Sequence, residues 1–434
     1  MRIGWKVVTG LAVAGATRAQ TPAGIAAVDS AGVARVAWSR AATALRDHNA
    51  NAARAEVDHA ANAWPTQAAY LWASATLAAR AGDTARLRDM LASLAAMGLG
   101  RDLHRDTSFA RYLQLPTIAP LIVTLSAQAM SEARSHVQAT LLDSTFWPEG
   151  VDYDSRTGRF YVASIRHRTV AEVIPGKPAR ELWTRDKPDM GAVYGVRIDA
   201  ARGLLWATMS APRRIAGDAA GDSTIAALIR VRLRDGAIER RWNVASPGPH
   251  TLGDLAIGPG GDVFVTDSDQ PVLYRLRSGG DTLERITHPL FRSLQGMAPS
   301  PDGRVVYVAD YSHGILRVDL ATSAVARLDD APHSTSLGCD GIVWHRGAII
   351  AVQNGVSPAR IMRFVLDSSG RRIVRAEVLD RNSAIADEPT IGTVAGGEFV
   401  YVANSQWEKF AESGSRKSDV RLTMPILLAV PLPP

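Results

Sequence analysis

Four side chains able to do acid–base chemistry stand at or just before one repeated position of this 434-residue chain. Glu149, Tyr194 and Asp340 each open one copy of a phrase that recurs six times, and His250 lies three residues before Gly253, which opens another. Imidazole titrates near neutral pH, so His250 could be the general base for attack on an ester. Taken singly, a carboxylate at such a position could be solvated or could bond its own turn. The shared register of the two carboxylates favours a common site instead, with Asp340 as the second catalytic candidate.

The repeated phrase predicts the elements that position these residues. Each copy has a short apolar run, a tight polar turn that usually contains glycine, and a second apolar run, which is the pattern of a β-hairpin. By subtraction the copies start 45, 59, 42, 45 and 51 residues apart, which leaves room for two outer strands per unit. Such units are typical of four-stranded propeller blades, so we predict a mainly β, six-bladed β-propeller over residues 131–434. The copies are EGVDYDSRTGRFYVAS from Glu149, YGVRIDAARGLLWATM from Tyr194, GDLAIGPGGDVFVTDS from Gly253, QGMAPSPDGRVVYVAD from Gln295, DGIVWHRGAIIAVQN from Asp340 and IGTVAGGEFVYVANS from Ile391.

The innermost strand of a blade runs from one face of the ring to the other, so the opening residues should surround one mouth of the central channel. Tyr194 would there stack against a substrate or donate a hydrogen bond, unless it is only a half-buried strand aromatic. Asp254 should point away from the channel on an alternating strand, although it adjoins an opening residue. The expected ring is Glu149, Tyr194, Gly253, Gln295, Asp340 and Thr390 or Ile391, and the expected pocket residues are Tyr194, Asp254, Thr390, Asn354 and Asn404.

Residues 31–130 have a different character, rich in Ala, Leu and Arg and without strand alternation. Apolar residues recur at helical spacing, which predicts four short helices up to Gly98. Ala60, Pro65, Ala75 and Gly82 match positions of the tetratricopeptide repeat, which this segment resembles over a little under two repeats. The alternative is a plain helical hairpin domain.

Composition and the N-terminus restrict the class of protein. Arg2 and Lys6 precede an apolar stretch at 7–16, a pattern that predicts a signal peptide over residues 1–19 and export to a bacterial periplasm or the exterior. That stretch is too short to span a bilayer, and we expect no membrane span after it. Removal of the signal peptide takes away Arg2, Lys6 and Arg18 and lowers the formal net charge from +6 to +3. The sequence has no basic cluster interleaved with aromatic residues that would indicate nucleic-acid binding. Cys339 is the only cysteine, so the chain forms no internal disulfide.

The phrases FWPEGVDYD, LGDLAIGPGGDVFVTDS, LQGMAPSPDGRVVYVAD and CDGIVWHRGAIIAVQNG resemble the senescence marker protein, gluconolactonase and luciferin-regenerating-enzyme-like family. That resemblance covers about residues 146–405 and implies a six-bladed propeller with calcium or another divalent metal at the channel mouth. Glu149 matches the glutamate of the family's PEG phrase, and Asp340 matches the aspartate of its DG phrase. Gln295 and Gly253 stand where asparagine is expected. The implied ligands are therefore Glu149, Gln295 and Asp340, fewer than calcium prefers.

Two functions follow. The first is an exported, metal-dependent hydrolase of small lactones or esters. The second is a non-catalytic propeller that binds a ligand or protein, with the helical segment recruiting a protein partner. The absence of the GxSxG, HExxH and phosphate-loop motifs gives no support to serine hydrolases, zincins or nucleotide enzymes.

Overall fold

A computed structural model of the chain describes residues 30–141, 143–184, 187–211, 225–411 and 416–433. The chain divides into two compact units, residues 1–129 and 130–434. The predicted signal peptide lies outside the described residues, so export remains a prediction. Among the described helices, none is both long enough and apolar enough to cross a membrane.

The first unit contains the four predicted helices. The Asn49 side chain accepts a hydrogen bond from Ala52 N and caps the start of α3. The Asp83 side chain accepts one from Arg86 N and caps the start of α5. Gly82 ends α4 in the left-handed conformation at φ 79°. The tetratricopeptide resemblance stays a prediction. The helices are α2 (Ser30–Arg46), α3 (Ala50–Ala63), α4 (Ala68–Ala81), α5 (Thr84–Ala96), the 3₁₀ turn η1 (Ala110–Tyr112) and α6 (Ala119–Gln128).

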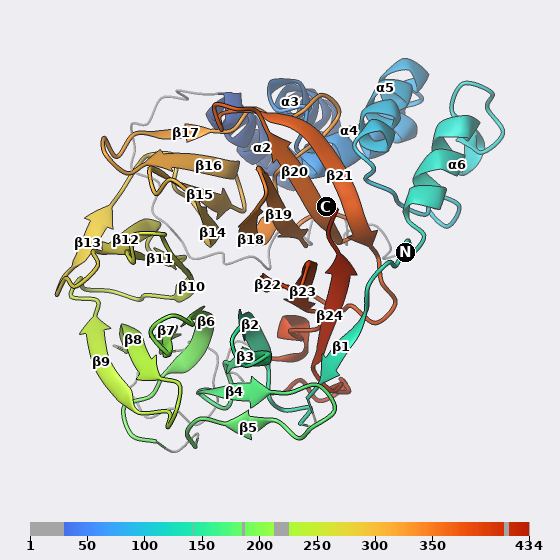
Figure 1. Cartoon of the computed structure of the whole chain (residues 1–434). Helices are drawn as coiled ribbons and strands as arrows, with labels where there is room; N and C mark the ends of the chain where they lie inside the picture. The colour runs from blue at the N-terminus through green and yellow to red at the C-terminus, as the bar shows by residue number, and fades with distance from the viewer. Residues whose placement is uncertain (1–29, 142, 185–186, 212–224, 412–415, 434) are drawn as a thin grey trace. The chain divides into compact units, whose positions relative to one another are not determined.

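The second unit is a six-bladed β-propeller, which confirms the predicted fold class (Figure 1). Each blade is a four-stranded antiparallel sheet, and each innermost strand contacts the innermost strand of the next blade. Blade 1 contains β2 (Pro148–Asp154), β3 (Arg159–Ser164), β4 (Thr169–Val173) and β5 (Arg180–Glu181). Blade 2 contains β6 (Ala192–Asp199), β7 (Leu204–Ser210), β8 (Ala226–Arg232) and β9 (Ile238–Asn243), and blade 3 contains β10 (Leu252–Ile257), β11 (Val263–Asp267), β12 (Val272–Leu276) and β13 (Leu283–Ile286). Blade 4 contains β14 (Leu294–Pro299), β15 (Val305–Asp310), β16 (Gly314–Asp319) and β17 (Val325–Arg327), and blade 5 contains β18 (Cys339–His345), β19 (Ala348–Gln353), β20 (Arg360–Leu366) and β21 (Ile373–Arg381).

The two ends of the second unit meet in blade 6 and close the ring. This blade contains β22 (Gly392–Ala395), β23 (Glu398–Val402), β24 (Ile426–Pro431) and, outermost, β1 (His136–Thr140). The apolar tail supplies β24, and β1 pairs with it, with His136 opposite Ala429. Because β1 and β22 come from opposite ends of this unit, the closing sheet ties the first blade to the last.

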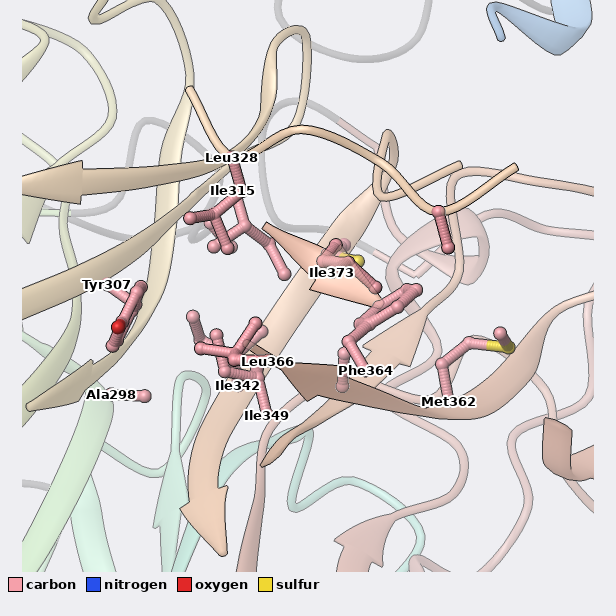
Figure 2. Packing of buried hydrophobic residues seen from close by; sticks show 14 of the residues in the cluster. Ala298, Tyr307, Ile315, Leu328, Ile342, Ile349, Met362, Phe364, Leu366 and Ile373 are labelled. Carbon is pink, nitrogen blue, oxygen red and sulfur yellow. The ribbon is translucent and has the colours of Figure 1, made fainter. Parts of the chain in front are cut away.

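Apolar side chains fill the spaces between neighbouring blades. Figure 2 shows one such core, in which Tyr307 and Ile315 of blade 4 lie near Ile342, Ile349 and other apolar residues of blade 5. Strands such as β15 and β19 are covered on both faces, so their sequences are almost continuously apolar.

The phrase-opening residues lie at a repeated irregularity of the innermost strands. In blades 1 to 5 the pairing register shifts at the phrase-opening position, as between Pro148 and Val151 in β2. The next residue is glycine in four of these blades, where adjacent innermost strands approach closely. A Cβ on Gly150 would lie 2.5 Å from Tyr194 O, and one on Gly296 would lie 2.7 Å from Asp340 O. Glycine is needed here because the backbones of neighbouring blades nearly touch.

Candidate functional site

Glu149 and Asp340 belong to the same mouth of the channel, as their shared register predicts. Asn354 Nδ2 donates to Asp340 Oδ2 and to Pro389 O, both at 2.8 Å. Thr390, next to Pro389, donates from Oγ1 to Glu149 O at 2.8 Å. Hydrogen bonds through the Pro389–Thr390 segment therefore connect the Asp340 carboxylate with the main chain at Glu149.

Burial and neighbouring negative charge make both carboxyl groups costly to ionise. Burial, followed by the charge of Asp340, holds the pKa of Glu149 well above its usual range. Burial raises the pKa of Asp340 to about 6, against the hydrogen bond from Asn354 and with a further contribution from the charge of Asp254. Two acids so close cannot both ionise cheaply, so the pair retains a proton near neutral pH unless a cation lies beside it.

An aromatic cluster covers Glu149 from the side of blades 1 and 2. Trp407 Nε1 donates to Glu149 Oε2 at 2.8 Å. The Trp407 ring lies edge-on to Trp147, with centroids 5.1 Å apart, and faces Tyr194 at 6.3 Å. Phe410 stacks on the far part of the cluster, 4.1 Å from Trp147. Tyr194 is thus buried in this cluster, and Trp407 fixes one oxygen of Glu149 while shielding it from water.

The sequence interpretation missed two further polar residues at the mouth, Glu388 and Tyr311. Burial raises the pKa of Glu388 to about 7, although its carboxylate oxygens accept from Glu408 N. Burial and then the charge of Asp340 raise the pKa of Tyr311, so its phenol stays protonated. Tyr311 directly follows the end of β15, and Glu388 precedes Thr390 by two residues. Both residues lie one or two positions outside the repeated phrases, so including those flanking positions in the sequence analysis would have identified them.

A second polar layer lies deeper along the innermost strands. Asp254 Oδ2 accepts from Arg197 Nη2 at 3.0 Å, and both side chains are buried. Asp152 accepts from Ile198 N at 2.6 Å and from Thr393 Oγ1. Burial raises the pKa of Asp254, and the guanidinium of Arg197 opposes that rise. The Asp254 carboxylate bonds Arg197 of the neighbouring innermost strand, and its charge contributes to the raised pKa values of Glu149 and Asp340, while its direction relative to the channel stays a prediction. This residue stands where the other blades have glycine after the phrase-opening residue.

The donor set at the mouth suits a hard divalent cation only in part. Among the described residues, no group of three or more His, Cys, Asp or Glu side chains is arranged to hold a metal ion. Yet Asn354 Oδ1 is buried, and no described group donates a hydrogen bond to it. A buried acceptor without a partner destabilises the folded protein unless a water molecule or a cation binds to it. Together with Glu149 and Asp340 it makes two carboxylates and one amide oxygen, to which water would add the remaining ligands of calcium.

Other predicted site residues have structural partners. His250 Nδ1 lies 2.6 Å from Asp267 Oδ2 at the end of β11, and Nε2 lies 2.9 Å from Ser246 O in the loop before β10, so both ring nitrogens have partners within blade 3 and its entry loop. Asn404 receives a hydrogen bond from Ile426 N and donates to Met424 O, which fixes the start of β24. The proposed base role of His250 stays a prediction without support from this geometry.

The remaining predicted positions differ in what they offer a ligand. Gln295 Nε2 donates to Ser293 Oγ at 3.2 Å within its own loop, and its role as a metal ligand stays a prediction. Gly253 has open surroundings, since a Cβ there would meet Ser268 Oγ and Thr266 Oγ1 at 3.6 and 3.7 Å. Cys339 is fully buried, and burial raises the pKa of its thiol, which keeps it protonated.

Comparison with known proteins leaves the family open, since no protein family and no curated protein matches the sequence. Solved structures with a similar fold include a gluconolactonase from Xanthomonas campestris, 17% identical, covering 71% of this chain and 93% of that one with a TM-score of 0.45. A virginiamycin B lyase from Staphylococcus aureus is 16% identical, covering 62% and 80% with a TM-score of 0.44. A luciferin-regenerating enzyme is 15% identical, covering 68% and 92% with a TM-score of 0.45. At such identities the likeness concerns the fold alone.

Proposed function

We propose that the propeller hydrolyses small esters or lactones at the mouth formed by Glu149 and Asp340, with a weakly held divalent cation. The observation that carries this proposal is the meeting of these two buried carboxylates beside the unsatisfied oxygen of Asn354. Paired acids with raised pKa values in a channel mouth are unusual unless they transfer protons or hold a cation.

Each residue at the mouth has a distinct part in this proposal. Asp340, with its pKa at about 6, is mostly ionised at pH 7 and can take a proton from an attacking water. Tyr311 keeps its proton and can donate a hydrogen bond to a substrate oxygen. Trp407 orients Glu149 and excludes water from it. Glu149, Asp340 and Asn354 would hold the cation, which when bound would polarise the substrate carbonyl.

A second function, a binding propeller without catalysis, is favoured by one specific observation. Glu149 is only 9% exposed, and Trp407 occupies one of its oxygens. A carboxylate so enclosed could serve only to hold the Trp407 segment in place. In that case the mouth would bind neither metal nor substrate.

Hydrolysis of short aryl esters and of small lactones separates the two functions. The native protein is assayed with calcium and with a chelator, beside Asp340→Asn and an exposed control, Asp89→Asn, in the helical unit. Loss of a general base should lower kcat by about 10²–10⁴, while the control keeps native activity. Equal activity of Asp340→Asn and the native protein would overturn the proposed role of Asp340. No turnover of any substrate, together with no calcium effect on stability, would favour the binding propeller.

A further inference from the structure

A cavity of about 110 Å³ lies between blades 2 and 3, at the end of the propeller opposite the mouth. Asp199, the last residue of β6, and Gly261, in the turn after β10, both line it, whereas the mouth lies at the beginnings of these strands. Cavities of about 150 Å³ accommodate a benzene molecule, so this one has room for an ion or group of several heavy atoms. Its lining contains four arginines: Arg202, Arg230, Arg240 and Arg277.

Two tryptophans fix part of this arginine group. Trp206 and Trp242 stack with centroids 5.3 Å apart. The guanidinium carbon of Arg230 lies 5.7 Å from one ring and 5.9 Å from the other, and that of Arg240 lies 4.7 Å from Trp242. Contacts with ring faces hold a guanidinium in a defined place at little entropic cost on binding. Both rings are buried in the core between the blades, so they form a wall and offer no platform for a ring ligand.

Carboxylates accompany the arginines but leave many donors unused. The ion pairs are Arg202–Asp199 at 2.6 Å, Arg230–Glu239 at 3.3 Å, Arg277–Glu284 at 2.6 Å and Arg240–Asp281. A guanidinium has five N–H donors, and one carboxylate occupies at most two of them. The buried Arg230 Nε is the atom that faces Glu239 Oε2, and at 3.3 Å it makes an ion pair without hydrogen-bond geometry. Asp199 also lines the cavity, so a ligand must accept several hydrogen bonds to offset its repulsion.

We propose that this cavity binds a tetrahedral oxyanion, either phosphate or sulfate. Such an ion carries acceptors in several directions, which suits a cavity lined by four arginines, and arginine binds its oxygens in pairs. A halide accepts without direction and could not use the fixed fork geometry. This site is separate from the mouth and does not depend on the function proposed there.

Isothermal titration of the full chain with inorganic phosphate and with sulfate tests the proposal, with chloride at equal ionic strength as the reference. Saturable binding with a Kd of about 1 mM or tighter is expected for the oxyanions and not for chloride. Arg277→Gln and Arg202→Gln should each weaken binding about tenfold or more, because each removes charged hydrogen bonds. Their side chains are 59% and 60% exposed, so the fold should tolerate the changes.

Arg234→Gln is the matched control. Arg234 is 75% exposed, pairs with Asp235 and does not line the cavity, while its replacement alters the net charge equally. Equal weakening by Arg234→Gln and Arg277→Gln would overturn the site in favour of general electrostatic attraction, as would binding of chloride as tight as that of phosphate. Glycerol phosphate distinguishes the source of the oxyanion. Tighter binding than phosphate indicates a phosphate ester as ligand, and weaker binding indicates the free ion.

Discussion

Asp340→Asn should stabilise the protein above pH 6 when calcium is absent. The change keeps the shape of the side chain and leaves an oxygen to accept from Asn354. It removes the negative charge that burial and the neighbouring acids make costly. Most substitutions of buried polar residues destabilise, so a gain in stability would be diagnostic.

The magnitude follows from the pKa of Asp340, which rises from 3.8 to about 6 on folding. At 1.36 kcal/mol per pKa unit, this difference corresponds to about 3 kcal/mol as an upper limit. A carboxyl with a higher pKa in the folded state favours folding at low pH, and this contribution is lost as the pH rises from about 4 through about 6. The variant lacks this loss, so its advantage should be near zero at pH 4 and approach about 3 kcal/mol at pH 8.

Urea unfolding at several pH values, in chelator and in excess calcium, measures this difference. Calcium at 100 times its Kd should cancel most of this difference, since it stabilises the native protein by about 2.7 kcal/mol and the variant has lost one of two carboxylate ligands. Asp89→Asn serves as the exposed control and should show no such pH dependence. If the Asp340→Asn variant is less stable than the native protein at pH 8 in chelator, the conclusion that burial and the charge of Asp254 make ionisation of Asp340 costly is refuted.

Three other results are expected. Gly253→Asn, which has room for its Cβ, and Gln295→Asn should each increase the calcium-dependent rise in Tm, and an unchanged rise would count against a metal at the mouth. Tyr311→Phe should lower kcat about tenfold or more with little change in Tm, because it removes only a hydroxyl group; unchanged kinetics would remove Tyr311 from the mechanism. Residues 130–434 expressed alone should unfold cooperatively in urea, since they form a compact unit with their own core, and a molten product would show that the helices complete it.

Much of the architecture was predictable because it depends on local periodicity. Alternating apolar residues and turn glycines define each hairpin, and a strand's period of two fixes which residues open each phrase at the mouth. The helices α2 to α5 likewise follow from apolar spacing and from their capping residues Asn49, Gly82 and Asp83. The convergence of Glu149 and Asp340 follows from the same repeat, without any motif shared between them.

The environment of these carboxylates was decided only by the tertiary structure. Trp407 meets Glu149 across almost the whole propeller sequence, and nothing near either residue in the chain indicates that contact. Asp254 bonds Arg197 of the preceding blade, although the two residues lie 57 positions apart in the sequence. The strand β1 joins the last blade, where the tail offers its partner, β24. Charge repulsion, burial and closure of the ring depend on distances between distant segments, whereas strand and turn propensity act between neighbours in sequence.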